Sequence, residues 1–201
     1  MPNPTIGNKT RGTSSPISHD NNGALLIVAL WGGQYAGGGG PTGVSVTYNG
    51  VALTQICEYS NYWYTSWWVL LTPAAGVHDL AFGNSGGGSI TGAYIYSIID
   101  GANSIPVNFA GYDYLSSAPS QSVTSAVNNL VLDIDANGTE EPTPTAGQTT
   151  QLSGASWDKG GSLVSVGAST TISYSHASGR GSLSGVEIVY SPSFIPRVMI
   201  F

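Results

Sequence analysis

The sequence has little charge: Asp, Glu, Lys and Arg make up 8% of its 201 residues, where roughly a quarter is usual. The net charge is −6, and the basic residues are scattered along the chain at Lys9, Arg11, Lys159, Arg180 and Arg197. A chain without a basic stripe cannot neutralise a row of phosphates, which argues against nucleic-acid binding. We expect a polar surface made from Ser, Thr, Asn and Gln instead.

Cysteine and long apolar runs are scarce as well. With one cysteine, Cys57, the chain cannot form an intramolecular disulfide, and we expect this residue to be a small buried apolar side chain. The first 20 residues contain no apolar signal-peptide core, and no apolar run reaches the roughly 18 residues of a membrane span. The sequence therefore predicts no secretion by the general route and no membrane span, yet its Thr/Ser/Gly-rich, lysine-poor composition is typical of extracellular β-proteins.

Helix signals are almost absent, because Gly, Pro, Thr, Ser and Asn interrupt each window of helical length. The sequence "YNG" (48–50) predicts a tight hairpin, since Asn-Gly readily takes the positive φ angles of a type I′ turn. Loops are expected at 32–43, 109–120 and 137–147. Strands are predicted at 5–13, 24–31, 43–49, 51–59, 62–71, 77–82, 90–98, 122–126, 129–136, 148–153, 162–166, 170–175 and 184–190.

Many short strands with frequent turns predict an all-β fold, an antiparallel β-sandwich of jelly-roll-like type. No break in composition divides the chain. We therefore expect a single domain at 1–192, followed by an apolar C-terminal tail at 193–201.

Several segments follow one another in a recognisable order. They are "GALLIVALW" (23–31), "VSVTYNGVALTQI" (44–56), "WWVLLTPAAGVHDLAF" (67–82), "ITGAYIYSIIDGANSIPV" (90–107), "NNLVLDIDANG" (128–138) and "LSGVEIVYSP" (183–192). Their order is similar to a β-sandwich module that recurs in phage virion (decoration and fibre) proteins and in bacterial surface proteins. The resemblance implies a building, decorating or adhesive module, and it carries over no active-site residues. The sequence departs from the module in the glycine run at 37–40, the aromatic excess at 62–68 and the tail.

No catalytic residues are expected. "GNSGG" (83–87) matches the nucleophile motif of chymotrypsin-like proteases, but that chemistry needs a His base and an Asp that orients it. His19 is too close in sequence for a two-barrel protease, so we interpret the run as a Gly-rich hairpin turn. Carboxylates that flank a scissile glycosidic bond cannot be nominated either, because Glu140 and Glu141 are adjacent and Glu187 stands alone.

"DIDANG" (133–138) matches the start of a calcium loop, with Asp133, Asp135 and Asn137 at alternate positions. A complete loop needs a bidentate Glu at its twelfth position, which here is Pro144. We favour polar residues near the end of a strand, with both carboxylates on one face, and calcium remains the alternative. No metal and no cofactor is expected, because metal-ligand spacing is also missing from the histidines, which we expect at surface or capping positions: His19, His78 and His176.

The segment "NYWYTSWWVLL" (61–71) is aromatic on both faces of the strand that it predicts. One face lines the core, and the other must be covered by a loop of the same chain, by a ligand or by a neighbouring subunit. Tyr and Trp are common at protein interfaces and also stack on sugar rings. The candidates for a subunit or glycan contact are Tyr62, Trp63, Tyr64 and Trp68.

The last residues, "SPSFIPRVMIF" (191–201), are too apolar to remain in water. "RVMIF" has the length and β-propensity to add as an edge strand, either to its own sheet or to a neighbour's. The candidates for this docking tail are Phe194, Ile195, Met199, Ile200 and Phe201.

Together these features predict a non-enzymatic virion structural protein, most simply a phage capsid decoration (cement) protein or a fibre or tail component. The expected partners are further copies of the chain, as a trimer by resemblance, and other virion proteins. The main alternative is an extracellular or cell-surface carbohydrate-binding adhesive module, with a surface glycan as partner. A third is a hydrolase with its site in the loops at 109–147.

Overall fold

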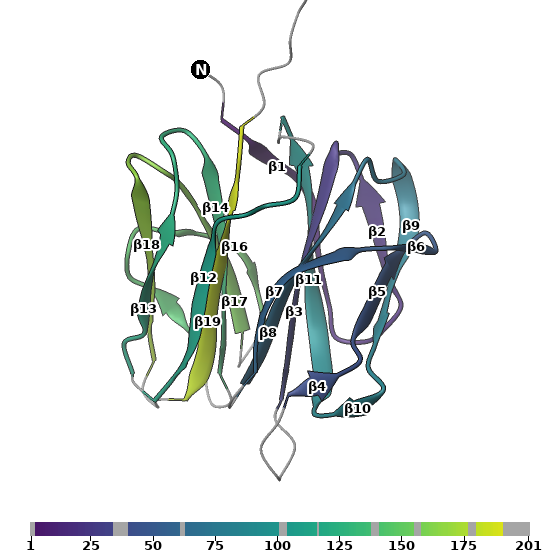
Figure 1. Cartoon of the computed structure of the whole chain (residues 1–201), viewed down its shortest axis with the longest axis horizontal. Coiled ribbons are helices and arrows are strands. Elements are labelled where there is room, and N and C mark those ends of the chain that lie inside the picture. Colours follow the sequence, from purple (N-terminus) through teal and green to yellow (C-terminus); the bar gives the residue numbers. More distant parts are fainter. Residues whose placement is uncertain are drawn as a thin grey trace, which may run out of the picture.

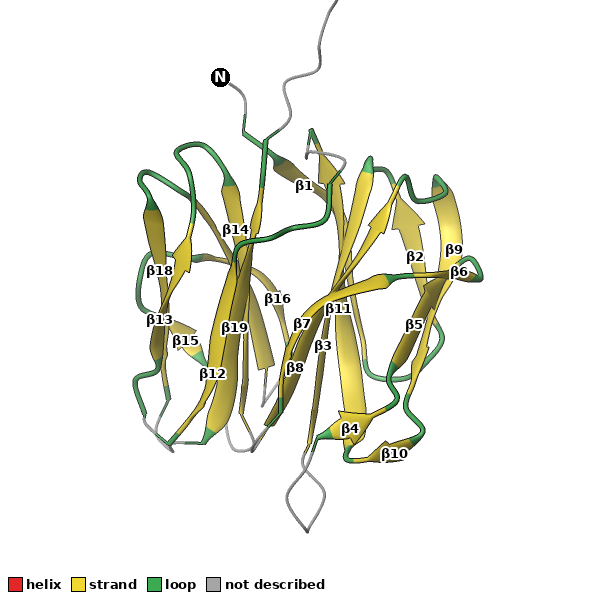
Figure 2. Ribbon diagram, viewed as in Figure 1, coloured by secondary structure: helices red, strands yellow, loops and turns green. Residues whose placement is uncertain are grey.

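Strands are the regular elements of this chain. The structure is a computed structural model, and it describes residues 3–33, 40–60, 63–100, 104–115, 117–137, 141–154, 158–176 and 180–190. Within these ranges there is no helix (Figure 2), and hence none long and apolar enough to cross a membrane. The predicted all-β, antiparallel sandwich fold is confirmed, with several antiparallel sheets packed on one another.

Residues 5–99 build the first pair of sheets, which we call sandwich 1. Inner sheet 1 has the order β1-β11-β3-β8-β7, and outer sheet 1 has the order β2-β9-β5-β6. A short ribbon of β4 (Pro41–Thr42) and β10 (Gly86–Gly87) extends one end. The strands of the two sheets are β1 (Thr5–Gly12), β2 (Ile17–Asn21), β3 (Leu25–Gly33), β5 (Ser45–Tyr48), β6 (Val51–Ala52), β7 (Thr54–Tyr59), β8 (Trp63–Leu71), β9 (Gly76–Gly83) and β11 (Ser89–Ile99).

Residues 109–188 build a second pair, sandwich 2. Inner sheet 2 has the order β12-β19-β14-β17-β16, and outer sheet 2 has the order β13-β18-β15. Its strands are β12 (Phe109–Tyr114), β13 (Ser120–Thr124), β14 (Leu130–Asn137), β15 (Thr143–Pro144), β16 (Thr149–Ser153), β17 (Asp158–Val164), β18 (Ser169–Ser175) and β19 (Gly181–Ile188).

The four sheets are stacked in layers, with outer sheet 2 at the left of Figure 1 and outer sheet 1 at the right. Successive side chains of a strand point to opposite faces, so the inner strands contribute to two cores. Leu25, Ile27 and Ala29 of β3 face inner sheet 2, whereas Leu26 and Val28 face outer sheet 1. A third core lies between the two sheets of sandwich 2. The inner strands are therefore buried on both faces, which is why "GALLIVALW" is apolar throughout.

The two sandwiches have the same topology. Strands β12 to β19 correspond, in chain order and in pairing, to β1, β2, β3, β5, β7, β8, β9 and β11. The strands β4, β6 and β10 have no counterpart. The chain thus contains a structural duplication, and its two units share the central core. The predicted single domain at 1–192 stays a prediction.

Most predicted strands are present, but several segments differ. The tight hairpin at 48–50 is confirmed, with positive φ at Asn49 and Gly50 and a Tyr48–Val51 pair at its base. The prediction of a loop over 109–120 is wrong, because residues 109–114 form the edge strand β12. Its glycine sits where a larger side chain would meet Tyr59. Four further strands are absent from the predicted set: β2 and β15, which lie in outer sheets, and β4 and β10, which pair with each other.

Candidate functional site

The aromatic strand β8 lies between two sheets of its own chain. Tyr64 and Trp68 face the core of sandwich 1 and are 0% and 6% exposed, whereas Trp67 is fully buried against inner sheet 2. The Trp67 indole donates a hydrogen bond to Ser184 Oγ at 2.9 Å. Of the alternatives left open by the sequence, cover by the same chain is thus the one that applies to these three side chains.

Trp63 is the described aromatic of this strand that is half-buried rather than buried. Tyr62 lies outside the described residues, and so do the tail candidates Phe194, Ile195, Met199, Ile200 and Phe201. A subunit or glycan contact of β8, and the docking role of the tail, stay predictions.

The "DIDANG" carboxylates lie on one face of β14, inside sandwich 2. Asp133 and Asp135 are fully buried. Asp133 Oδ1 accepts hydrogen bonds from the Tyr174 hydroxyl and, at 3.1 Å, from the Gly161 amide. Asp135 Oδ1 accepts one from the Tyr114 hydroxyl at 2.5 Å. The expected strand with both carboxylates on one face is confirmed.

Burial decides the protonation of these two groups. Desolvation disfavours a charged carboxylate, and it raises the pKa of Asp133 to about 7 and that of Asp135 to about 8. Residues 133–137 form extended strand, so they do not wrap around an ion as a calcium loop does. Among the described residues, no three His, Cys, Asp or Glu side chains are grouped as metal ligands.

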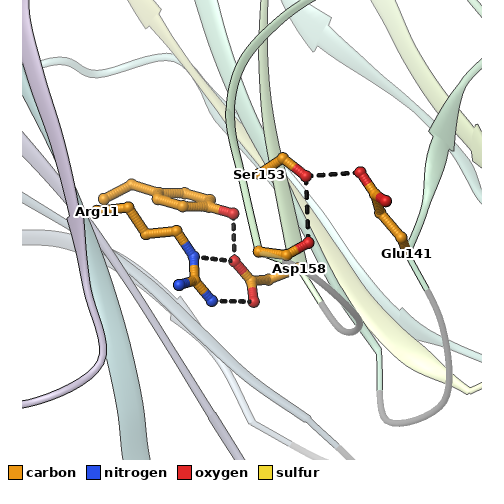
Figure 3. A network of polar contacts seen from close by, with 6 residues as sticks. Arg11, Glu141, Ser153 and Asp158 are labelled. Atoms are coloured by element: carbon orange, nitrogen blue, oxygen red, sulfur yellow. Dashed lines mark hydrogen bonds and ion pairs between the residues drawn. The ribbon is translucent and has the colours of Figure 1, made fainter.

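A charged pair joins the two sandwiches (Figure 3). Arg11 of β1 makes a bidentate contact with Asp158 of β17, through Nε at 3.0 Å and Nη2 at 2.9 Å. The Tyr94 hydroxyl donates to the same carboxylate, whose side chain is 3% exposed. Burial and the neighbouring carboxylate raise the pKa of Tyr94, and the hydrogen bonds that Arg11 donates to Asp158 raise the pKa of Arg11. The guanidinium also lies 5.1 Å from the Trp31 ring centre.

The polar contacts continue along the edge of inner sheet 2. Ser153 donates to Glu141 at 2.6 Å (Figure 3), and Lys159 contacts the same Glu141 oxygen at 2.9 Å. Lys9 of β1 donates to Gln151 of β16 at 2.8 Å. These contacts tie strands to one another and leave Glu141 paired within its own sandwich.

The expectation of surface or capping histidines is wrong for His19 and His176, which are 1% and 8% exposed. His19 contacts the hydroxyls of Thr10 and Ser97, both at 2.9 Å, and burial lowers its pKa to about 4. His78 is half-buried, with its ring edge-on to Tyr48. His19 alternates with exposed residues in the short polar strand β2, and His176 directly follows β18, so the sequence alone did not show that either side chain is buried.

The remaining residues considered from the sequence make contacts within the fold, as far as they belong to the residues that the structure describes. Ser85 lies in the turn that leads to β10, with its amide bonded to Thr42 at 3.0 Å. Glu187 is buried and accepts hydrogen bonds from the side chains of Asn108 and Asn129 and from an amide. Cys57 is half-buried against the central core, and burial raises its pKa to about 12. Glu140 lies outside the described residues.

The outer face of outer sheet 1 carries a hollow of about 600 Å³. Its lining includes Asn49 and Gly50, at the tip of the β5–β6 hairpin, and Val77, His78 and Asp79 of β9. Asp79 and the Val77 side chain are exposed there, the latter at 66%. The hollow therefore offers amide, carboxylate and apolar groups side by side.

The opposite end of the stack has a different surface. The strands β13, β15 and β18 carry no charged residue, and their outward side chains are hydroxyls. Thr145 Oγ1 and Ser173 Oγ are 2.6 Å apart on this face. The hydroxyl-bearing residues are Ser120, Ser122, Thr124, Thr143, Thr145, Ser169, Thr171, Ser173 and Ser175. This surface matches the uncharged, polar exterior predicted from the composition.

Fold and contacts together define a four-layered all-β protein made of two fused sandwiches. No family model matches the chain, and neither a curated protein nor a solved structure has significant similarity to it.

Proposed function

We propose that this chain is a non-enzymatic structural protein of a virus particle, a phage capsid decoration protein or a fibre or tail component. One observation carries the proposal. Most of the buried acid–base side chains among the described residues hold sheets together, and the outer face of outer sheet 2 presents hydroxyls, whereas His78 and Asp79 line the hollow on outer sheet 1.

Several ionisable side chains are buried between the sheets. Asp133, Asp135 and His19 are at most 1% exposed and sit between sheets, where no substrate reaches them. Asp158 is paired with Arg11 between the sandwiches. A general acid or base must lie within hydrogen-bond reach of the proton that it moves. The arrangement supports a scaffold whose polar interior fixes one sheet packing.

The virion assignment is supported by the order of the segments that resemble phage β-sandwich modules and by the weakly charged exterior. A particle component works as an assembly, so the proposal includes contacts between copies of the chain and with other virion proteins. The trimer is proposed from the resemblance, and the apolar tail at 193–201 is proposed as the docking segment.

The experiment is detection of the protein in purified particles. Gradient-purified virions from cells carrying the native gene should contain the protein at a fixed ratio to the coat protein. A matched lysate from which particles have been removed should be depleted of it. Presence in the soluble fraction alone, with none on particles, would refute the assignment.

A second candidate is an extracellular or cell-surface carbohydrate-binding module, and the hollow on outer sheet 1 favours it. Asn49 and Asp79 supply groups that hydrogen-bond sugar hydroxyls, and Val77 supplies an apolar wall. A glycan array with the wild-type chain and with Asp79→Ala tests this directly. Binding that Asp79→Ala abolishes would favour the module, whereas an empty array would dismiss it.

A further inference from the structure

The two inner sheets face each other around an approximate two-fold axis. Strand β1 lies against β16 and β7 against β12, and these are equivalent pairs, because β1 corresponds to β12 and β7 to β16. In the same way β8 packs on β19, and Gly160 of β17 lies under the Tyr96 hydroxyl of β11. This is the geometry of an isologous dimer interface, here formed within one chain.

The chemistry of the two faces, however, is not symmetric. Inner sheet 1 contributes large rings to the shared core, whereas inner sheet 2 contributes aliphatic side chains and, directly opposite the rings, the small residues Gly160 and Ser184. A Cβ added to Gly160 would lie 2.4 Å from Tyr96 Oη and 3.0 Å from a Tyr94 ring carbon. On the other side of the axis, Trp67 lies over Ser184 and bonds to it at 2.9 Å.

The pairing is therefore selective. Two copies of inner sheet 1 would set Trp67 and Tyr94 against equivalent rings, and the overpacked core would have to spread apart. Two copies of inner sheet 2 would lack rings opposite Gly160 and Ser184, and voids without van der Waals partners would remain at these positions between the aliphatic side chains. The Arg11–Asp158 contact adds a charge pair that is formed across the unlike faces.

We infer that the face of inner sheet 1 is a recognition surface for the face of inner sheet 2, so that the chain is a covalently linked heterodimer of duplicated sandwiches. The buried core between the sheets holds the sandwiches together. The connection Asp100–Asn108 between β11 and β12 is not needed for cohesion once the chain has folded.

The first experiment cuts the folded full-length chain. A protease site is inserted between Ser104 and Ile105, both exposed, and the purified protein is cleaved. The two fragments should elute together at the mass of the uncut protein, separate in denaturant, and re-form the same species when denaturant is removed. Fragments that separate or precipitate on cleavage in buffer would overturn the inference.

A second experiment tests the large-against-small packing by a double-mutant cycle on the nicked protein. Gly160→Ala should raise the dissociation rate of the fragments at least tenfold, because its methyl group meets the Tyr96 hydroxyl. Tyr96→Phe alone should change the rate less than twofold, since this hydroxyl has no hydrogen-bond partner among the described residues.

Combined with Gly160→Ala, Tyr96→Phe should restore part of the loss, because it removes the closest atom that the methyl group meets and leaves the contact with the Tyr94 ring. Gly167→Ala is the matched control, because no atom lies within 4 Å of a Cβ there. Equal effects of Gly160→Ala and Gly167→Ala, or no rescue by Tyr96→Phe, would show that the faces are not complementary in this way.

Discussion

The two buried aspartates of β14 predict that the protein becomes less stable as pH rises above neutrality. Burial raises the pKa of Asp133 to about 7 and of Asp135 to about 8, from 3.8 in the unfolded chain. The folded state therefore binds more protons than the unfolded state between pH 4 and 8. The stability from these groups is complete below the unfolded pKa and is lost as pH rises through the folded pKa.

Both aspartates lose protons in the folded state mainly in the window from pH 6.5 to 8. Burial lowers the pKa of His19 to about 4 from 6.5, so His19 acts in the opposite direction, mainly between pH 4 and 6.5 and with a smaller remainder up to about pH 7.5. Between pH 6.5 and 8, integration of the proton-binding difference for Asp133 and Asp135 gives a loss of about 2 kcal/mol in the free energy of unfolding. That is a large fraction of a typical stability of roughly 5–15 kcal/mol.

Urea unfolding followed by tryptophan fluorescence at pH 6.5, 7, 7.5 and 8 measures the slope. Asp135→Asn should remove most of it, because this side chain has the higher pKa and cannot ionise as an amide. Asp79→Asn, at an exposed position of β9, is the matched control and should leave the slope unchanged. A free energy of unfolding that is constant or rises over this window, or a slope that survives Asp135→Asn, would refute the reasoning.

Three further results are expected. Arg11→Met should lower the free energy of unfolding by about 3–5 kcal/mol in urea titrations, because it leaves the buried Asp158 carboxylate without its cation. The control Lys9→Met removes the contact with the Gln151 amide and should cost less than about 1 kcal/mol. Equal costs for the two variants would contradict the role of the Arg11–Asp158 pair. Excess chelator should leave the melting temperature unchanged. If calcium were bound and present at 1,000 times its Kd, its removal would lower the free energy of unfolding by about 4 kcal/mol, and such a loss would support the calcium alternative. Deleting 193–201 should leave a folded domain that by light scattering no longer assembles, and a truncated chain that fails to fold would place the tail in the core instead.

Local pattern was enough to predict the fold class and most strands. The Asn49–Gly50 turn could be predicted because both residues tolerate positive φ. Strand β3 could be predicted because its apolar run is long enough for a strand. The aromatic excess on both faces of β8 correctly required cover on both sides. What the pattern does not contain is which sheet supplies that cover.

The missed features depend on contacts between distant residues. Arg11 and Asp158 are 147 positions apart, and nothing near either one indicates the other. The duplication did leave a trace in sequence, since "GALLIVALW" and "NNLVLDIDANG" begin equivalent strands β3 and β14. The similarity is hard to see in the sequence, because β14 carries Asp133 and Asp135 where the equivalent strand β3 is apolar. The residues of β12 do not predict a strand, because its glycine and tyrosines fit contacts with other sheets that the local sequence does not show.

The most direct test of the structural-protein proposal is quantitative mass spectrometry on density-gradient fractions of a lysate from cells carrying the native gene. The proposal predicts that the chain co-sediments with assembled particles at a constant ratio to the coat protein across the particle peak, and that the ratio survives a second gradient. A chain found throughout the soluble fractions and absent from the particle peak would contradict it.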